Sequence, residues 1–239
     1  MGEQCNQLLI VKDVRASYGE TQVLRGFSLE VNKKEMGVII GPNGHGKSTA
    51  LKAVAGLLRV QSGSIYFEGD DITELPVHER VDRGIVLVSE EGNLFVYMTV
   101  LENLKLGAYR EEAWKETLTE VFRIFPRLEE RKNQIVWTLS GGERKMCAIG
   151  RGLMAKPKLL MLDEPSLGLA PKITESLFET IHEISRTGIT LLFAEQNVYR
   201  ASDIANKFYL VNNGKIELEG SVDEVLNSPL VKRTYFGTS

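Results

Sequence analysis

The first third of the chain alternates apolar and polar residues in the rhythm of β-strands. Residues 8–14 form a short apolar stretch, and residues 25–31 alternate apolar side chains with polar or small ones. A period of two places one face of a strand against a core and the other face in solvent. We therefore predict that the chain begins with an antiparallel sheet.

Four runs are nearly continuous in apolar residues, which is the pattern of strands buried on both faces of a parallel sheet. They lie at residues 37–40, 84–88, 158–165 and 190–194. Near the end of the chain, Asn213-Gly214 between two further apolar stretches strongly predicts a two-residue β-hairpin.

Helical spacing of apolar residues fills the interval between the second and third of these strands. Residues 99–110 have a helical pattern, and residues 114–125 form a clearer amphipathic helix that Pro126 ends. We assign about 99–155 to a helical subdomain inserted into one domain of residues 1–239. The aromatic side chains of this segment are expected to pack rather than to form a cofactor pocket.

A length of 239 residues suits one large domain. We predict an α/β fold with a mainly parallel sheet, an N-terminal antiparallel β subdomain and the helical insertion. A net charge of −3 gives no electrostatic footprint for nucleic acid, so we expect no such partner. Apolar runs stay below the roughly 18–20 residues that cross a bilayer, and the N-terminus lacks a signal-peptide pattern. We expect a soluble, cytoplasmic protein that reaches membranes only through a partner.

The sequence GPNGHGKST follows the first buried strand and leads into a helical pattern. This is the context of a phosphate-binding loop, and the spacing G-x-x-x-x-G-K-[ST] is complete. Its glycines let backbone N–H groups approach phosphate oxygens, and the helix N-terminus adds positive potential. A P-loop NTPase core is therefore predicted. The expected ATP-binding residues of this loop are Gly41, Pro42, Asn43, Gly44, His45, Gly46, Lys47, Ser48 and Thr49.

Three side chains of the loop carry separate expectations. Lys47 can reach the β- and γ-phosphates as a point charge. The Ser48 hydroxyl is a hard oxygen ligand suited to Mg²⁺. His45 occupies a variable position of the motif, and we expect a solvated side chain there rather than a proton donor.

Two carboxylates, Asp163 and Glu164, end the third buried strand. In a parallel sheet the carboxyl ends of the strands border the ligand site, so we expect both side chains beside the phosphates. Asp163 can hold Mg²⁺, and Glu164 can orient and deprotonate an attacking water. Glu90 follows another predicted strand, where a plain surface loop is the alternative. The run 195–197 ends a further predicted strand at the same edge of the sheet.

The pentapeptide Leu139-Ser140-Gly141-Gly142-Glu143 opens another helix. Ser140 is a good N-cap, and the paired glycines expose N–H groups that can bind an anion. A capped helix needs no ligand to form, so this segment alone leaves both interpretations open. Tyr18, beside a tight turn, can likewise stack on a purine or simply pack.

The phosphate loop, LSGGE and LLMLDEP, in this order, resemble the ATP-binding subunits of ABC transporters over essentially the whole chain. Residues 166–171, Glu90 and the run 195–197 most resemble importer subunits for branched-chain amino acids. The resemblance implies ATP and Mg²⁺ as cofactors and ATP hydrolysis coupled to transport. It also implies transmembrane permease partners and a peripheral position on the inner face of the cell membrane.

The resemblance gives roles to matching residues. Tyr18 would stack on adenine. The resemblance also implies a head-to-tail dimer with a second ABC ATPase subunit, either identical or a sister protein. In this dimer the γ-phosphate of the ATP held by one subunit would be contacted by four residues of the other: Ser140, Gly141, Gly142 and Glu143.

Two positions depart from the commonest ABC pattern. Glu90 stands where a Gln usually touches Mg²⁺ and the attacking water; a carboxylate can still coordinate the metal, but it adds negative charge near the phosphates. Gln196 stands where a His usually contacts the γ-phosphate, and an amide can hydrogen-bond there without acting as an acid. Both departures put more of the chemistry on Glu164.

The resemblance leaves several questions open. Residues 95–98, FVYM, either line a groove for a short helix of the membrane subunit or pack beneath the helical insertion. Residues 142–144 and 231–235 also resemble ATPases of lipid or lipopolysaccharide export, and a soluble ABC protein without a transporter is a further rival. The transported substrate is not encoded here, because membrane and binding subunits select it.

Overall fold

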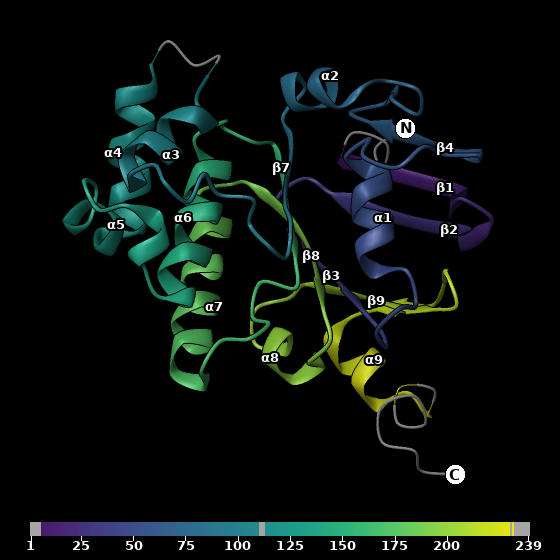
Figure 1. Cartoon of the computed structure of the whole chain (residues 1–239). Helices are drawn as coiled ribbons and strands as arrows, with labels where there is room; N and C mark the ends of the chain where they lie inside the picture. Colours follow the sequence, from purple (N-terminus) through teal and green to yellow (C-terminus); the bar gives the residue numbers. More distant parts are fainter. Residues whose placement is uncertain (1–5, 110–112, 230, 232–239) are drawn as a thin grey trace.

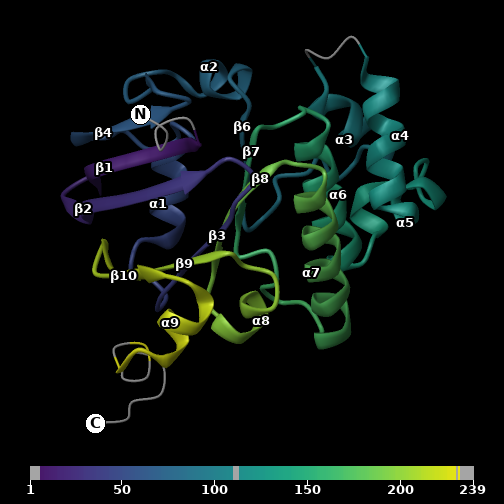
Figure 2. The same ribbon diagram turned by 180° about the vertical axis from the view of Figure 1, so that it is seen from behind.

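Two β-sheets carry the fold, with one helix between them and a group of helices on the far face of the larger sheet (Figures 1 and 2). The computed structural model describes residues 6–109, 113–229 and 231. Of the segment 231–235, which resembles export ATPases, only Val231 lies within the described residues.

The smaller sheet is the predicted antiparallel one. Its order is β2-β1-β4-β5, formed by β1 (Gln7–Tyr18), β2 (Thr21–Asn32), β4 (Ser62–Phe67) and β5 (Asp70–Asp71). Strand β1 is longer than the apolar stretch 8–14 because a register shift lies between Val11 and Val14, where Asp13 has a φ of 46°. Such an irregularity breaks the two-residue period and hides the rest of the strand from a pattern search.

The larger sheet has the order β10-β9-β3-β8-β7-β6, and all neighbours pair in parallel except β10 with β9. The mainly parallel sheet of the predicted α/β class is thus confirmed, as is the hairpin at Asn213-Gly214. The strands are β3 (Met36–Ile40), β6 (Ile85–Val88), β7 (Leu159–Asp163), β8 (Thr190–Glu195), β9 (Lys207–Asn212) and β10 (Lys215–Gly220).

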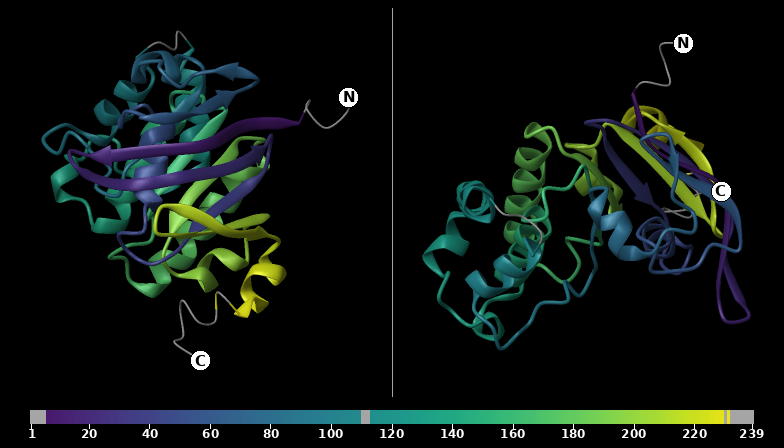
Figure 3. Two further views of the ribbon diagram at one scale, coloured as in Figure 1. Left: turned by 90° about the vertical axis from the view of Figure 1, so that its right-hand side faces the viewer. Right: turned by 90° about the horizontal axis from the view of Figure 1, so that it is seen from above.

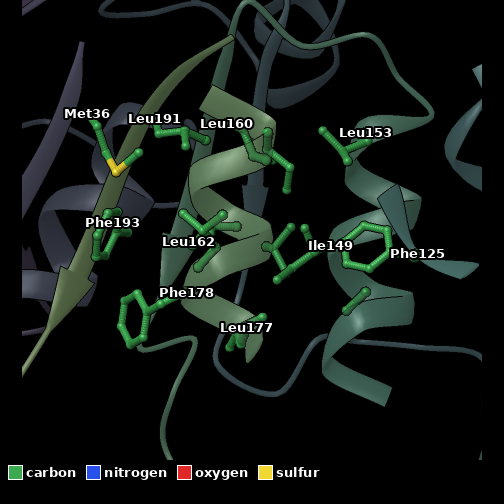
Figure 4. Packing of buried hydrophobic residues seen from close by; sticks show 14 of the residues in the cluster. Met36, Phe125, Ile149, Leu153, Leu160, Leu162, Leu177, Phe178, Leu191 and Phe193 are labelled. Atoms are coloured by element: carbon green, nitrogen blue, oxygen red, sulfur yellow. The ribbon is translucent and has the colours of Figure 1, made fainter. Parts of the chain in front are cut away.

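Successive residues of the central strands enter two different cores, which explains why their sequences are apolar throughout. In β7, Leu160 and Leu162 belong to one buried cluster, whereas Leu159 and Met161 belong to the other. Figure 4 shows the first cluster, where Leu160 and Leu162 meet Ile149 and neighbouring helical side chains.

Helix α1 (Lys47–Val54) fills the space between the two sheets, in contact with β2, β7 and β8. The opposite face of the large sheet is covered by α6 (Gly141–Leu153), which contacts β6 and β7, and by α7 (Pro171–Arg186), whose Phe178 packs against Phe193 of β8. Three further short helices lie outside the segment between β6 and β7: α2 (Val77–Asp82), α8 (Val198–Ser202) and α9 (Val222–Asn227).

The segment between β6 and β7 is helical, as its pattern predicts. It contains α3 (Val100–Gly107), α4 (Trp114–Ile124), α5 (Pro126–Glu130), the 3₁₀ helix η1 (Val136–Thr138) and α6. Phe122 and Phe125 are buried and Trp114 packs partly buried against the same core, so the expected packing role of the aromatics in residues 114–125 is confirmed. Seen from above, these helices lie at the opposite end of the molecule from the antiparallel sheet (Figure 3). The division at 99–155 stays a prediction.

Arg80 of α2 holds the end of α1 in place. Its guanidinium is 2% exposed and donates hydrogen bonds to the carbonyls of Ala53, Val54, Thr73 and Leu75. Two of these carbonyls end α1, where a cation also interacts favourably with the helix dipole.

We expect Arg80→Met to lower the free energy of unfolding by about 2–4 kcal/mol, since each buried carbonyl left without a partner costs about 1–3 kcal/mol. Urea denaturation of the nucleotide-free protein measures this. Arg83→Met is the matched control, because Arg83 pairs with Asp70 on the exposed surface, and its loss should cost less than about 1 kcal/mol. Equal losses in both variants would contradict the prediction.

Candidate nucleotide-binding site

The predicted phosphate loop joins β3 to α1 at the carboxyl edge of the large sheet. Gly46 is the N-cap of α1 with a φ of 108°, a conformation that favours glycine. Gly41 lies so close to β9 that a Cβ at this position would collide with the carbonyl oxygen of Val211. The neighbouring strand and the helix start therefore fix both ends of the loop.

Lys47, the first residue of α1, turns its side chain back into the loop. Its ammonium donates to the carbonyls of Gly41 at 2.9 Å and Pro42 at 3.3 Å. It also lies 3.2 Å from Oε1 of Glu164, and the residue is only 3% exposed. A buried charge of this kind is tolerated because it is paired and hydrogen-bonded.

Ser48 and Asp163 bring two hard oxygen atoms together. The Ser48 hydroxyl donates to Oδ1 of Asp163 at 2.8 Å. Burial raises the pKa of Asp163, which the hydrogen bond from Ser48 opposes and the charge of Glu164 reinforces. These donors fit Mg²⁺, which usually takes one or two protein ligands and completes its shell with phosphate and water. Among the described residues there is no group of three or more His, Cys, Asp or Glu side chains that could hold a metal ion without other ligands.

Glu164 follows β7 in an unusual backbone conformation. Its φ is 42°, in the left-handed region that residues other than glycine seldom adopt, and its N–H donates to the carbonyl of Ala194 at 3.0 Å. The residue is 8% exposed, with its carboxylate against Lys47. The structure thus brings Lys47, Ser48, Asp163 and Glu164 together as the motifs predict.

Glu195, the last residue of β8, is buried at the carboxyl edge of the sheet. Its Oε1 accepts a hydrogen bond from the backbone N–H of Ser166 at 3.2 Å. Burial raises the pKa of Glu195, and the nearby charge of Glu164 acts in the same direction, although bonds from Ser166 oppose it. Gln196, the next residue, is exposed.

Glu90 lies on the exposed loop that follows β6. Its carbonyl, rather than its carboxylate, accepts a hydrogen bond from Nζ of Lys145 at 2.6 Å. No pattern in the sequence singles out Lys145, because a single lysine on an amphipathic helix looks like a solvated residue. Only the packing of α6 against β6 and β7 brings it to the site.

His45 differs from its expected role. Its side chain is half-buried, with Nδ1 2.8 Å from Oδ1 of Asn212, and its carbonyl accepts from the N–H of Gly214. The expectation of a solvated side chain is wrong because the β9–β10 hairpin packs over the loop. No local sequence signal connects residue 45 with residues 212–214.

Tyr18 lies at the tip of the β1–β2 hairpin, 47% exposed. Further along β2, Val23 and Leu24 pack beside Gly46, so this hairpin borders the phosphate loop. The ring is therefore available at the edge of the candidate site.

Ser140 caps α6 with reciprocal bonds to Glu143. The Ser140 hydroxyl and N–H both donate to Oε2 of Glu143, and the Glu143 N–H donates back to the Ser140 hydroxyl. Arg131 pairs with the same carboxylate at 2.7 Å. Burial opposes the shift, but the Ser140 bonds and the charge of Arg131 leave the pKa of Glu143 lowered. Within one chain, α6 and α1 lie on opposite faces of the large sheet (Figure 1).

This fold and site define a class of protein: a nucleotide-hydrolysing P-loop protein in which a second helix, α6, also begins with glycines. Residues 24–167 match the family described as ABC transporter. The chain belongs to this family, as one of its ATP-hydrolysing subunits.

Similar proteins cover nearly the whole chain. The high-affinity branched-chain amino acid transport ATP-binding protein BraG of Pseudomonas aeruginosa is 41% identical over 232 residues, which are 96% of this chain and 100% of BraG. A probable branched-chain amino acid transport ATP-binding protein LivF of Archaeoglobus fulgidus is 37% identical over 94% of this chain and 96% of its own. The lipopolysaccharide export system ATP-binding protein LptB of Haemophilus influenzae is 34% identical over 96% and 97%, respectively.

Solved structures give the same result. A nucleotide-free ATP-binding cassette from an ABC transporter superposes with a TM-score of 0.86 and 31% identity, covering 97% of this chain and 100% of its own. The ADP conformation of MJ1267, an ATP-binding cassette of an ABC transporter, gives a TM-score of 0.86 and 32% identity over 97% and 99%. The P-loop fold with its antiparallel sheet is thereby confirmed. None of the described helices is long and apolar enough to cross a membrane.

We expect Glu195→Gln to stabilise the nucleotide-free protein at neutral pH. Between its ordinary pKa of 4.5 and its raised value, the folded state binds more protons than the unfolded state, so stability falls as pH rises through this window. The variant lacks this loss. Its advantage in urea denaturation should be full above the raised pKa and should vanish below pH 4.5. A variant no more stable than the parent at pH 7.5 would contradict the prediction.

Proposed function

We propose that the chain is the ATP-binding and ATP-hydrolysing subunit that powers a membrane importer for branched-chain or other amino acids. One observation carries the catalytic part of this proposal. The ammonium of the buried Lys47 lies 3.2 Å from the carboxylate of Glu164. The hydroxyl of the next residue, Ser48, lies 2.8 Å from the carboxylate of Asp163. This arrangement joins a phosphate-binding cation, a metal-binding pair and a candidate base at one edge of the sheet.

The loop residues 41–49 bind the phosphates through backbone N–H groups, and the Lys47 ammonium exchanges loop carbonyls for phosphate oxygens. Ser48 and Asp163, with Glu90 from the facing loop, hold Mg²⁺. When bound, this ion neutralises charge on the phosphates. The exposed Tyr18 stacks on the adenine.

Glu164 acts as the general base for the attacking water. Its left-handed backbone directs the carboxylate toward Lys47, which lies next to the phosphates in this arrangement. Gln196, exposed at the end of the neighbouring strand, hydrogen-bonds the γ-phosphate without supplying a proton. Proton transfer therefore falls to Glu164.

A second subunit completes the site. Ser140 and the glycines 141–142 form a helix N-terminus suited to an anion, but α6 lies on the face of the sheet opposite α1. A head-to-tail dimer places this helix start over the γ-phosphate bound by the partner. Glu143 contributes mainly by holding the cap, since its carboxylate is committed to Ser140 and Arg131.

An exposed apolar surface supports a permease partner and a peripheral place on the cytoplasmic face of the membrane. Phe95, Val96 and Tyr97 are 54%, 41% and 86% exposed, so these side chains do not pack beneath the helical insertion. Phe95 also lines a groove of about 280 Å³ with Leu57, Leu106 and other apolar side chains. Such a rimmed groove suits a short amphipathic helix of a membrane subunit.

The relatives favour amino acids as cargo, since BraG and LivF carry names of branched-chain amino acid transport. The 34% identity to LptB makes lipopolysaccharide export the second candidate. Purification of the tagged chain from detergent-solubilised membranes separates the two. A co-purified permease that takes up labelled leucine in vesicles supports import, and one that extracts lipopolysaccharide supports export.

We expect Glu164→Gln to retain Mg²⁺-dependent ATP affinity and to lose turnover by on the order of 10²–10⁴, the usual contribution of a positioned base. The variant should also accumulate as an ATP-bound dimer, because reopening requires hydrolysis. Phosphate release and light scattering measure the two effects.

The control for this variant is Lys47→Ala, which should lose ATP affinity itself and so should form no dimer. Turnover at the normal rate in Glu164→Gln would show that another group is the base. No nucleotide affinity in the unmodified protein would refute the proposed function.

We expect Tyr97→Glu to abolish recruitment to membranes that contain the permease, because it places a charge on the exposed apolar surface of Phe95, Val96 and Tyr97 that the permease would bury. ATP affinity should stay unchanged. Thr119→Glu adds the same charge to an exposed position of α4 outside the groove and should bind normally. Sedimentation with vesicles measures recruitment, and unchanged binding by Tyr97→Glu would remove the exposed surface of residues 95–97 from the proposal.

A further inference from the structure

Helix α6 holds the loop after β6 through two long cationic side chains. Lys145 donates from Nζ to the carbonyl of Glu90 at 2.6 Å. One turn and a half further on, Arg151 donates to the carbonyls of Gly92 at 2.8 Å and Asn93 at 2.9 Å. The first part of the loop, from Glu90 to Asn93, is therefore hydrogen-bonded to α6 at two points.

The two cations differ in their surroundings. Lys145 interacts electrostatically with four carboxylates, of which Glu90 has the largest effect, followed by Asp163, Glu195 and Glu164. Burial nevertheless leaves the pKa of Lys145 lowered. For Arg151, by contrast, the nearby titratable group is Cys147. Arg151 thus only holds the loop through hydrogen bonds, whereas Lys145 also interacts electrostatically with the carboxylates of the candidate site.

The need for a cation at this position follows from Glu90. A carboxylate on this loop adds one negative charge near the place where a polyphosphate binds, and it interacts electrostatically with the buried Asp163. Lys47 is already paired with Glu164. Like charges a few ångströms apart in a partly buried site repel one another strongly unless a cation is close.

We propose that Lys145 is a positioning residue of the nucleotide site, whose charge offsets Glu90 and so permits a carboxylate to face Mg·ATP on this loop. The inference rests on the proposed function. It gives the site an internal counter-ion delivered by the same helix that carries the Ser140 cap.

Equilibrium ATP affinity tests this inference without relying on turnover. Titration calorimetry is performed on the full chain with ATP in EDTA and with Mg·ATP. Lys145→Gln should weaken ATP binding in EDTA about three- to tenfold, and Mg·ATP binding less, because the metal removes part of the ligand's charge. The loss should shrink at roughly 0.5 M salt, where exposed charges are screened within a few ångströms.

Charge rescue separates electrostatics from loop fastening. Glu90→Gln in the Lys145→Gln background should restore most of the lost affinity, and Lys145→Arg should bind like the parent. Glu90→Gln alone should tighten ATP binding in EDTA, which keeps the inference testable if Lys145→Gln folds poorly. Lys132→Gln removes a charge from an exposed position on the same group of helices and should change nothing.

The inference is wrong if Lys145→Gln binds ATP in EDTA as tightly as the parent. It is also wrong if Lys145→Gln loses affinity and the added Glu90→Gln substitution does not restore it. In either case the parent still binds Mg·ATP, so the proposed function stands. Failure of the parent to bind ATP at all is the distinct result that refutes both.

Discussion

The burial of an ammonium group at the edge of an otherwise apolar sheet is the constraint on which this site depends. Lys47 is only 3% exposed, and it is tolerated because two loop carbonyls and Glu164 surround its charge. These partners come from segments more than a hundred residues apart. Their meeting requires β3 and β7 to end at the same edge, which the parallel pairing of both strands with β8 ensures.

At this edge of the sheet the buried carboxylates outnumber the buried ammonium group of Lys47. Asp163 and Glu195 have raised pKa values, chiefly because burial disfavours their charged forms. A site that destabilises its own carboxylates in this way gains from any ligand that brings a cation, since metal binding relieves the repulsion between them. Under the proposed function, the excess of negative charge at this edge therefore favours binding of ATP together with Mg²⁺ over binding of ATP alone.

The sequence predicts most of the fold, because its strongest patterns report burial directly. Continuous apolar runs mark strands that face two cores, and the phosphate loop, the acidic pair and the Ser140 cap are local motifs with local physics. What the sequence hides are contacts between distant segments. The register shifts between Val11 and Ser17 conceal the last part of β1, from Arg15 to Tyr18, and His45 is covered by a hairpin about 170 residues later. Lys145 reaches Glu90 only through the packing of α6.

Helix α6 joins two parts of the site that the motifs describe separately. Its Ser140 cap and Lys145 are five residues apart, about 7.5 Å along the axis at 1.5 Å per residue. A hydrogen-bonded helix of 13 residues does not stretch between them, so a displacement of the cap displaces the Glu90 carbonyl by a similar amount. In the proposed dimer, the cap that faces the partner's γ-phosphate and the bond to the Glu90 loop therefore belong to one rigid helix. The short bond at Lys145, rather than any flexible linker, makes that connection.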